Sequence, residues 1–280
     1  MKNHTLTLEH SELGKQSDYS STYNPDKLFP IARKIKRDEI GVPAALPFFG
    51  FDLWNHYEVS WLNEKGKPIA ALAEICYPCD TDYIIESKSM KLYFNSFNNT
   101  KFKDEHALQE IIKKDIEDRI FGEVFVKITL LNNLSDHLIF ANFEGKNLDL
   151  LDIECTSYRI QQDLLKTEGE KEIEETVYSH LLKSNCLITN QPDWASIQIA
   201  YTGKKINHEG LLQYIVSFRN HNEFHEQCIE RIFMDIMNYC NPKELTVYGR
   251  YTRRGGLEIN PYRSTQKIKQ HMPNLRLCRQ

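Results

Sequence analysis

Residues 93–99 read YFNSFNN and residues 214–220 read YIVSFRN, so tyrosine, serine, phenylalanine and asparagine recur at the same offsets in two distant parts of the chain. An amphipathic helix pattern comes after each segment. Four shared letters arise easily by chance, but the presence of a helix pattern after both segments favours a tandem duplication. We therefore expect two similar units of about 120 residues each.

Both helix patterns have apolar residues at three- and four-residue spacing. The first pattern begins after Asp104, a favourable N-cap, and stops at Gly122, while the second ends at Asn241-Pro242. The apolar positions are Leu108, Ile111, Ile112, Ile116 and Ile120 in the first helix, and Phe224, Cys228, Ile232, Phe233, Ile236 and Cys240 in the second. Residues 124–130 predict a strand after the first helix, and residues 245–262 predict a hairpin, turning at RRGG, after the second. The expected fold class is α+β: two tandem units, each an antiparallel sheet with helices on one face.

A charged run, KTEGEKEIEE at residues 166–175, lies between the two halves. A run with so few apolar residues is typical of a solvated linker or an exposed helix. The prediction is an N-terminal domain over residues 1–165 and a C-terminal domain over residues 176–280.

The composition is that of a soluble globular protein, with 41% hydrophobic and 26% charged residues among 280 and a net charge of −4. No segment has the roughly 18 apolar residues of a membrane helix, and the first residues lack the apolar core of a signal peptide. Seven thinly spread cysteines predict reduced thiols in the cytoplasm. The negative charge argues against nucleic acid as the main partner. Residues 250–280 are an exception, because their eight Lys and Arg residues against one acid predict either an anion site or a solvated basic face.

The stretch SNCLITNQPDW, residues 184–194, places the thiol of Cys186 seven residues before the carboxyl of Asp193. A lone cysteine is more often a small buried hydrophobe than a nucleophile. Here the flanking residues are polar and make a poor core, and Pro192 favours an irregular loop, so we expect an exposed thiol. Asp193 is then either a turn residue or the group that takes the thiol proton and returns it to a substrate.

The stretch NEFHEQ, residues 222–227, puts Glu226 in the first turn of the second helix, where the helix dipole favours an anion. A carboxylate there can accept two parallel N–H bonds from a flat molecule such as a guanine-like ring, with His225 beside it. The alternative is a glutamate that merely favours the helix start.

Two further stretches combine polar groups with turn or strand patterns. In IIESKSMKLYF, residues 84–94, a polar cluster interrupts a strand pattern and predicts a strand edge that meets a ligand. In YTRRGGLEI, residues 251–259, basic side chains beside glycine suit either a phosphate or an ordinary hairpin turn. The pair in CYPC, residues 76–79, lacks the second pair that zinc usually needs, so no metal is expected.

These stretches together resemble the NADPH-dependent 7-cyano-7-deazaguanine reductases, the nitrile reductases of the queuosine pathway, in their longer two-module form. The motifs ESKSMKLYFNSFN, SNCLITNQPDW, FRNHNEFHEQCIERIF and YTRRGGLEINPYRS carry the resemblance, which covers most of residues 20–270. It implies a tandem pair of tunnelling-fold units, in agreement with the duplication inferred from the repeat. It also implies NADPH as cofactor and a small deazapurine substrate. From charge and hydropathy we expect no direct nucleic-acid or membrane partner, and the edge strands of such small sheets favour assembly into a homodimer.

The resemblance carries over residue by residue. Cys186 resembles the nucleophile that forms a covalent thioimide, and Asp193 resembles the proton donor. The substrate contacts are matched by Ile85, Glu86, Ser87, His225 and Glu226, and the NADPH contacts by Ser87, Lys88, Arg254 and Gly255. The family often has glycine where this chain has Asn190 and Ala195.

The implied chemistry explains why a thiol and an acid lie close together. A nitrile accepts hydride poorly until a thiol adds to it, so the reaction needs a nucleophile, a proton shuttle and a cofactor used twice. One alternative is a cyclohydrolase-like enzyme of the same fold, which would need zinc ligands. The other is a non-catalytic protein that binds a purine, or RNA through its basic C-terminal stretch.

Overall fold

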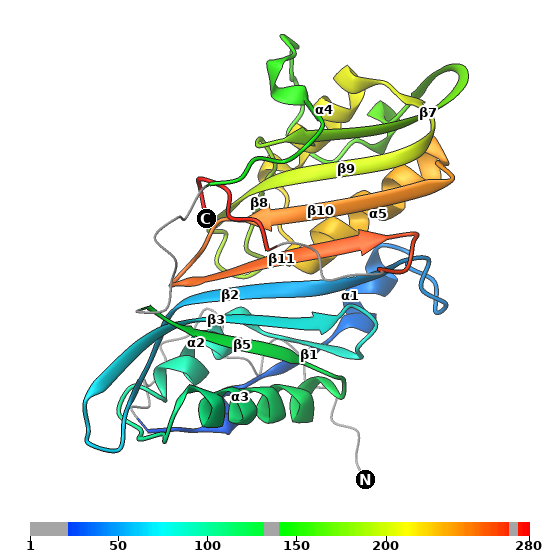
Figure 1. The fold of residues 1–280 in the computed structure, drawn as a ribbon. Helices are drawn as coiled ribbons and strands as arrows, with labels where there is room; N and C mark the ends of the chain where they lie inside the picture. The colour runs from blue at the N-terminus through cyan, green and yellow to red at the C-terminus, as the bar shows by residue number, and fades with distance from the viewer. Residues whose placement is uncertain (1–21, 132–139, 269–273) are drawn as a thin grey trace. The chain divides into compact units, whose positions relative to one another are not determined.

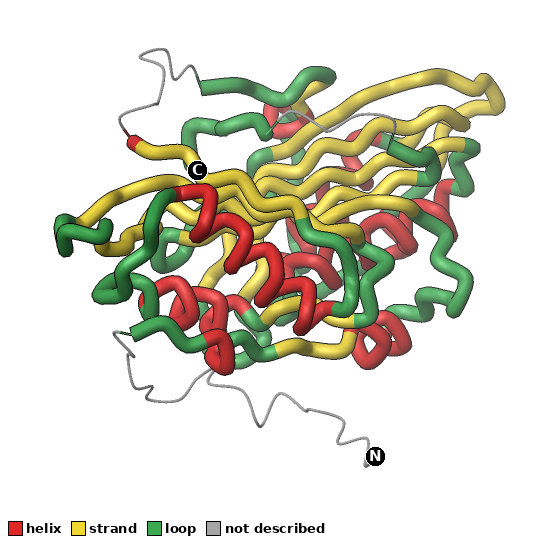
Figure 2. Tube along the Cα trace, turned by 60° about the horizontal axis from the view of Figure 1, so that its bottom comes forward, coloured by secondary structure: helices red, strands yellow, loops and turns green. Residues whose placement is uncertain are grey.

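The computed structural model describes residues 22–131, 140–268 and 274–280, and shows two compact units (Figure 1). The first unit takes Met1–Asp38, Leu53–Leu138 and Arg253–Glu258, and the second takes Glu39–Asp52, Ile139–Thr252 and Ile259–Gln280. Both units mix helices with a sheet that contains antiparallel strand pairs, so the α+β prediction is confirmed. In each unit the helices lie on one face of the strands (Figure 2).

The first unit has the strand order β5-β3-β2, and β3 and β5 run antiparallel. A separate two-stranded sheet pairs β1 with β4. The elements are η2 (Pro25–Lys27), β1 (Pro30–Ala32), α1 (Arg33–Glu39), β2 (Phe49–Leu62), β3 (Pro68–Pro78), β4 (Tyr83–Ile85), α2 (Ser87–Asn95), α3 (Glu105–Ile120) and β5 (Phe125–Leu130). The residues of β2 are divided between the two units.

The second unit has the strand order β11-β10-β9-β7-β6, with β8 paired to the start of β9. Its central pairs, β7/β9, β9/β10 and β10/β11, are antiparallel. The elements are β6 (Lys146–Asn147), η4 (Leu148–Leu150), η5 (Gln162–Leu164), β7 (Thr167–Ser179), β8 (Lys183–Asn185), β9 (Pro192–Ile206), α4 (His208–Ser217), η6 (Phe218–Asn220), α5 (His225–Cys240), β10 (Glu244–Tyr251) and β11 (Leu257–Ser264).

The sequence repeat corresponds to a repeated set of side-chain contacts. In the first unit the hydroxyl of Tyr93 donates to Asp115 on the next helix at 2.6 Å, and in the second unit Tyr214 donates to Asp235 at the same distance. The serine three residues after each tyrosine donates to that tyrosine's carbonyl oxygen, again at 2.6 Å in both units. The repeated letters therefore join the same two helices in each unit, as a duplication predicts.

The ends of the two predicted helices lie close to the expected positions. Asp104 caps α3 by accepting from the backbone N–H of Ala107 at 2.8 Å. Gly122, however, is not the residue that turns the chain. The left-handed position after α3 is Phe121, with φ of 56°, and the corresponding position after α5 is Asn241, with φ of 46°.

Two local predictions were wrong. Residues 87–94 are not part of a strand, because Glu86 caps the start of α2 and Ser87–Asn95 is helical. Residues 167–175 are not a linker, because they form the first part of β7. The run is extended because it pairs with β9 in an antiparallel ladder, and three of its glutamates pair with lysines at the surface: Glu168 with Lys205, Glu170 with Lys204 and Glu172 with Lys243. The domain division at residues 165 and 176 remains a prediction.

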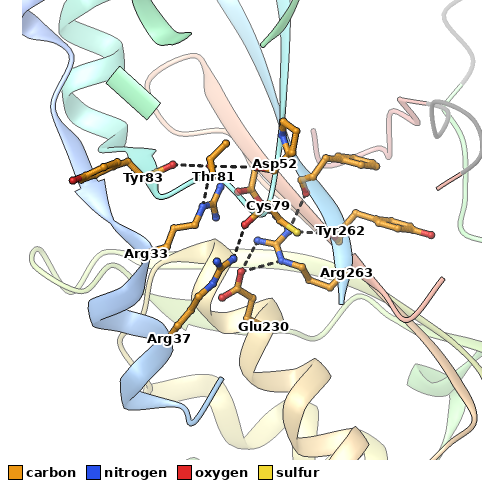
Figure 3. Close-up of polar contacts among 11 residues, drawn as sticks. Arg33, Arg37, Asp52, Cys79, Thr81, Tyr83, Glu230, Tyr262 and Arg263 are labelled. Atoms are coloured by element: carbon orange, nitrogen blue, oxygen red, sulfur yellow. Dashed lines mark hydrogen bonds and ion pairs between the residues drawn. The ribbon is translucent and has the colours of Figure 1, made fainter. Parts of the chain in front are cut away.

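The second unit contains a buried cluster of charges (Figure 3). Arg263 donates to Glu230 at 2.9 Å and lies 2.9 Å from Asp52, with all three side chains at most 4% exposed. A buried charge without partners would cost several kcal/mol, so the charge of Arg263 serves these internal ion pairs and is not available to a ligand at the surface. Arg250, also buried, donates to Tyr248 and Gln280. The basic character of the C-terminal stretch is therefore partly internal, which weakens its interpretation as a nucleic-acid surface.

Candidate functional site

A tight hairpin between β8 and β9 presents the two predicted catalytic groups. Ser184 pairs with Asp193 in the ladder, and the backbone N–H of Cys186 extends the pairing to the carbonyl of Gln191 at 2.8 Å. Paired residues of an antiparallel ladder share a face, and residues two apart on one strand also share it. The side chains of Cys186 and Asp193 therefore belong to the same face of the hairpin, which is the placement that the sequence predicts.

The turn of this hairpin requires a left-handed residue. Asn190 adopts φ of 55° and donates its backbone N–H to the carbonyl of Cys186 at 3.2 Å. Asparagine tolerates this conformation better than most residues, and glycine adopts it freely. The side-chain amide of Asn222 donates to both Cys186 and Asn190, so the loop is fixed from a second segment.

That second segment brings the predicted ring-binding pair to the hairpin. The backbone N–H of Asn185 donates to His221 at 2.8 Å, and its carbonyl accepts from Glu223 at 3.1 Å. Helix α5 begins two residues later, at His225. The imidazole Nε2 of His225 then lies 3.4 Å from Oδ2 of Asp193. Residues from three parts of the second unit thus meet at one place.

Burial in this cluster differs from the simple expectation of an exposed loop. Asp193 is only 7% exposed and belongs to β9, so Pro192 begins a strand rather than an irregular loop. The Cys186 thiol is half-buried, and Glu226, at 4% exposed, lies in the first turn of α5. A carboxylate at this helix start is favoured by the exposed backbone N–H groups and the dipole.

The remaining predicted residues lie in the first unit, where Ile85 ends β4 and Glu86 begins α2. The Glu86 carboxylate accepts from the backbone N–H groups of Lys88 at 2.6 Å and Ser89 at 2.8 Å. Burial raises the pKa of Glu86, although these hydrogen bonds and the charge of Lys91 act in the opposite direction. The carboxyl of Glu86 therefore holds the helix start that carries Ser87 and Lys88.

The stretch RRGG forms a two-residue hairpin turn. Arg254 and Leu257 exchange backbone hydrogen bonds at 2.8 and 3.2 Å, and both glycines between them have positive φ, 55° and 71°. This geometry favours glycine at both positions. A side chain on Gly256 would also meet Glu58 at 2.4 Å. The guanidinium of Arg253 lies over the ring of Tyr57, 4.6 Å from its centre.

Lys91 is a residue that the sequence interpretation missed. A Cβ on Gly255 would lie 3.2 Å from Cδ of Lys91, so α2 and the RRGG turn meet within the first unit. Lys88 and Lys91 are three residues apart on a helix and share a face. Two lysines, Arg254 and glycine backbone are groups that bind phosphate well, so these residues fit NADPH. The spacing of the lysines carries this signal only once SKSMKLYF is recognised as a helix.

Comparison with known proteins identifies the family. The family model described as "Nitrile reductase, 7-cyano-7-deazaguanine-reductase N-term" matches residues 19–128, and the model described as "QueF-like protein" matches residues 192–270. Proteins named "NADPH-dependent 7-cyano-7-deazaguanine reductase" are 59% identical in Legionella pneumophila (strain Lens) and 57% identical in Cupriavidus pinatubonensis. These alignments cover 96% and 91% of this chain, and 95% and 93% of the two relatives. The chain belongs to the 7-cyano-7-deazaguanine reductase family.

The two matched regions contain all the predicted site residues except Cys186, the predicted nucleophile. The first region includes Glu86 and Lys88, and the second includes Asp193, Glu226 and Arg254. Cys186 lies just before the second region, so its role rests on the hairpin geometry and on the sequence motif.

The two cysteines of CYPC, Cys76 and Cys79, differ in burial. Cys79 is buried and Cys76 is half-buried. Among the described residues, no group of three or more His, Cys, Asp or Glu side chains is arranged to hold a metal ion. No helix in residues 22–131, 140–268 and 274–280 is long and apolar enough to cross a membrane.

Proposed function

We propose that this chain reduces the nitrile of 7-cyano-7-deazaguanine to the aminomethyl group, with NADPH as reductant, in queuosine biosynthesis. The observation that carries the proposal is the β8/β9 hairpin, which places the Cys186 thiol and the Asp193 carboxyl on one face beside His225 and Glu226. Family membership supports the substrate and the cofactor, because the relatives bear both in their names.

The first step is addition of the Cys186 S–H across the nitrile. A bond forms between sulfur and the nitrile carbon, one π bond of the C≡N group breaks, and the thiol proton ends on nitrogen. The product is a thioimide, and no electrons are transferred. The half-buried thiol is open to a substrate, and the hydrogen bonds that fix its loop hold sulfur in one position.

Asp193 moves the proton in this step. Its carboxyl lies on the same face as the thiol and is held 3.4 Å from His225. It accepts the proton from sulfur and delivers it to the nitrile nitrogen, and it serves the later protonations in the same way.

NADPH, when bound, supplies the hydride that each of the two C=N reductions requires. The chain's own part is to hold and protonate the intermediates. After the first reduction the S–C bond breaks and its electron pair returns to sulfur, while the nitrogen lone pair forms a C=N bond. A proton leaves nitrogen and reaches sulfur through Asp193, so an imine and the Cys186 thiol result. The second reduction and protonation give the amine, and Cys186 is again a thiol.

Recognition of the ring is assigned to the start of α5 in the second unit. Glu226 accepts the N–H groups of the deazaguanine edge, and His225 contacts the same ring. Ile85, Glu86 and Ser87 supply further contacts. The assignment of Ile85, Glu86 and Ser87 is supported by the capping of α2, because the hydrogen bonds of the Glu86 carboxylate fix the backbone on either side of it.

The Glu226→Ala variant is expected to weaken substrate binding by at least about tenfold, because each hydrogen bond to a charged group contributes about 1.5–3 kcal/mol. Isothermal titration calorimetry with the nitrile substrate measures this directly. The matched control is Glu209→Ala, which removes an exposed first-turn glutamate from α4 and should leave affinity unchanged. Undiminished affinity in Glu226→Ala would mean that the ring is held elsewhere.

The Arg254→Ala variant is expected to raise the Michaelis constant for NADPH about tenfold or more and to reduce its dependence on salt. Arg254 and Lys88 are assigned to the cofactor phosphates, with Ser87 and Gly255 as further contacts. An arginine can donate two parallel hydrogen bonds to the 2′-phosphate of NADPH, and NADH lacks this phosphate. Steady-state kinetics with both cofactors at several ionic strengths provides the test.

Arg253→Ala serves as the control for this variant, because Arg253 is stacked on Tyr57 and should alter the Michaelis constant less. Equal use of NADH and NADPH by the unmodified enzyme would contradict the phosphate assignment and leave RRGG as a turn only.

We further propose a homodimer in the cytoplasm without a direct nucleic-acid partner. In the first unit β5 ends the strand order, and Phe125 on it is 42% exposed. Such an edge is a place where another chain can pair. Light scattering after gel filtration measures the mass, and a monomer at micromolar concentration would contradict the dimer.

A further inference from the structure

The buried ring of Tyr251 lies flat against His225. The two ring centres are 3.8 Å apart and the planes differ by 2°. Tyr251 is the last residue of β10 and His225 is the first of α5, so the contact joins a strand end to a helix start. No motif in the sequence connects the two residues.

Side chains hold both backbone polar groups of Tyr251 by hydrogen bonds. Its N–H donates to Asn260 at 3.1 Å, and its carbonyl accepts from the side chain of Gln280 at 3.2 Å. Gln280 also donates to Asn260 at 3.0 Å, and all three residues are at most 3% exposed. The ring is thus presented from a rigid support.

The ladder places this ring on the same face as the proposed proton carrier. Tyr251 pairs with Ala195 on β9, two residues after Asp193. Paired residues and residues two apart share a face, so Tyr251 and Asp193 both point toward α5. Gly249 makes the close approach of α5 possible, because a Cβ there would meet Ile229 of α5 at 2.6 Å.

Hydrogen bonding alone does not set the orientation of the His225 ring. Its Nε2 lies 3.4 Å from Asp193, and its Nδ1 is buried with no hydrogen-bond partner among the described residues. A functional histidine commonly has its second nitrogen held by an acceptor, which fixes the ring plane and tautomer. Here the stacked ring of Tyr251, rather than a hydrogen-bond acceptor, holds the plane of the His225 imidazole.

We propose that Tyr251 is a positioning residue for proton transfer: its ring fixes the plane of the His225 imidazole and, through it, the Asp193 carboxyl. The role belongs to the aromatic face. The hydroxyl is buried against the Cys228 thiol, one turn along α5 from His225. This inference rests on the proposed function, because it assigns Asp193 to the proton.

The experiment compares Tyr251→Leu, which removes the ring, with Tyr251→Phe, which keeps it. The control is Tyr248→Leu, which removes an equally buried tyrosine from the same strand but from the face that packs on Phe143 and Leu277. We expect Tyr251→Leu to lower kcat on the order of 10- to 100-fold, as small misplacements of reacting groups do. Substrate affinity should stay within about threefold, the pH profile of kcat should change, and Tyr251→Phe should restore most of the rate.

A second measurement does not depend on activity. In the ligand-free protein, the ring ¹⁵N signals of His225 report its tautomer and ring environment, with His225→Gln as the assignment control. They should change in Tyr251→Leu and be retained in Tyr251→Phe and Tyr248→Leu. If Tyr251→Leu does not fold, Gly249→Ala takes its place, because its Cβ pushes on Ile229 and lies 3.4 Å from the Tyr251 ring.

The inference is overturned if Tyr251→Leu, or Gly249→Ala in its place, leaves both kcat and the His225 signals no more altered than Tyr248→Leu does. It is also overturned if Tyr251→Phe lowers kcat as much as Tyr251→Leu does, since the hydroxyl and not the ring would then position His225. Failure of the proposed function looks different: the unmodified protein would then form no covalent adduct with the nitrile, while the His225 signals would still report on the ring.

Discussion

The Cys186→Ala variant is expected to bind 7-cyano-7-deazaguanine and to turn over none of it. Without the thiol no thioimide forms, and the nitrile itself is a poor hydride acceptor. Affinity should remain, because the ring is assigned to Glu226 and His225, which start a helix that the substitution leaves intact. Calorimetry measures the affinity, and NADPH oxidation followed by absorbance measures the turnover.

Cys155→Ala is the matched control for this variant. It removes another half-buried thiol of the second unit, and it should retain full turnover. Measurable reduction of the nitrile by Cys186→Ala would contradict the nucleophile assignment and would require another of the seven cysteines, or none, in that role.

The Asp193→Asn variant is expected to lose about 10²- to 10⁴-fold in turnover, the usual contribution of a positioned acid–base group. Asparagine keeps the shape of the side chain and its place in the β8/β9 pairing, but it cannot carry the proton. Thiol addition and both later protonations should slow together. Single-turnover measurements of adduct formation, combined with steady-state kcat, separate these steps.

A suitable control is Asp149→Asn, which alters a half-buried carboxylate that accepts from Ser179 and His180 in the same unit. It should affect stability more than chemistry. Unaltered turnover of Asp193→Asn across the pH range would reduce Asp193 to a structural residue of the strand.

The tandem plan was predictable because it depends on local patterns that occur twice. Tyr93 and Tyr214 begin equivalent segments, and each anchors the next helix through an aspartate. Helical spacing and the cap at Asp104 located α3 to within a residue. These features need only neighbours in sequence, which is why pattern and propensity are sufficient.

Two elements were missed, one because its partners are distant in sequence and one because its cap is an uncommon residue. The charged residues 167–175 form a strand because they pair with β9, about 30 residues along the chain, and no local pattern reveals this partner. The polar residues 86–89 begin a helix because the Glu86 carboxylate caps it, a use of glutamate that is less common than serine or aspartate.

For the site, the motifs predicted which residue types matter but not all of their neighbours. Cys186 and Asp193 are close in sequence, so a hairpin brings them together directly. Tyr251 reaches its position through strand register and helix packing, and no spacing in the sequence marks it. The spacing of Lys88 and Lys91 becomes informative only once Ser87–Asn95 is known to be a helix. Buried contacts between remote segments are the part of a site that requires a structure.

The most direct test of the account is mass spectrometry of the unmodified protein mixed with 7-cyano-7-deazaguanine in the absence of NADPH. We expect a mass increase of one substrate molecule per chain, and proteolytic mapping should place it on Cys186. Adding NADPH should remove the adduct and release the aminomethyl product. No adduct under these conditions, or an adduct on a different cysteine, would contradict the central claim that Cys186 attacks the nitrile.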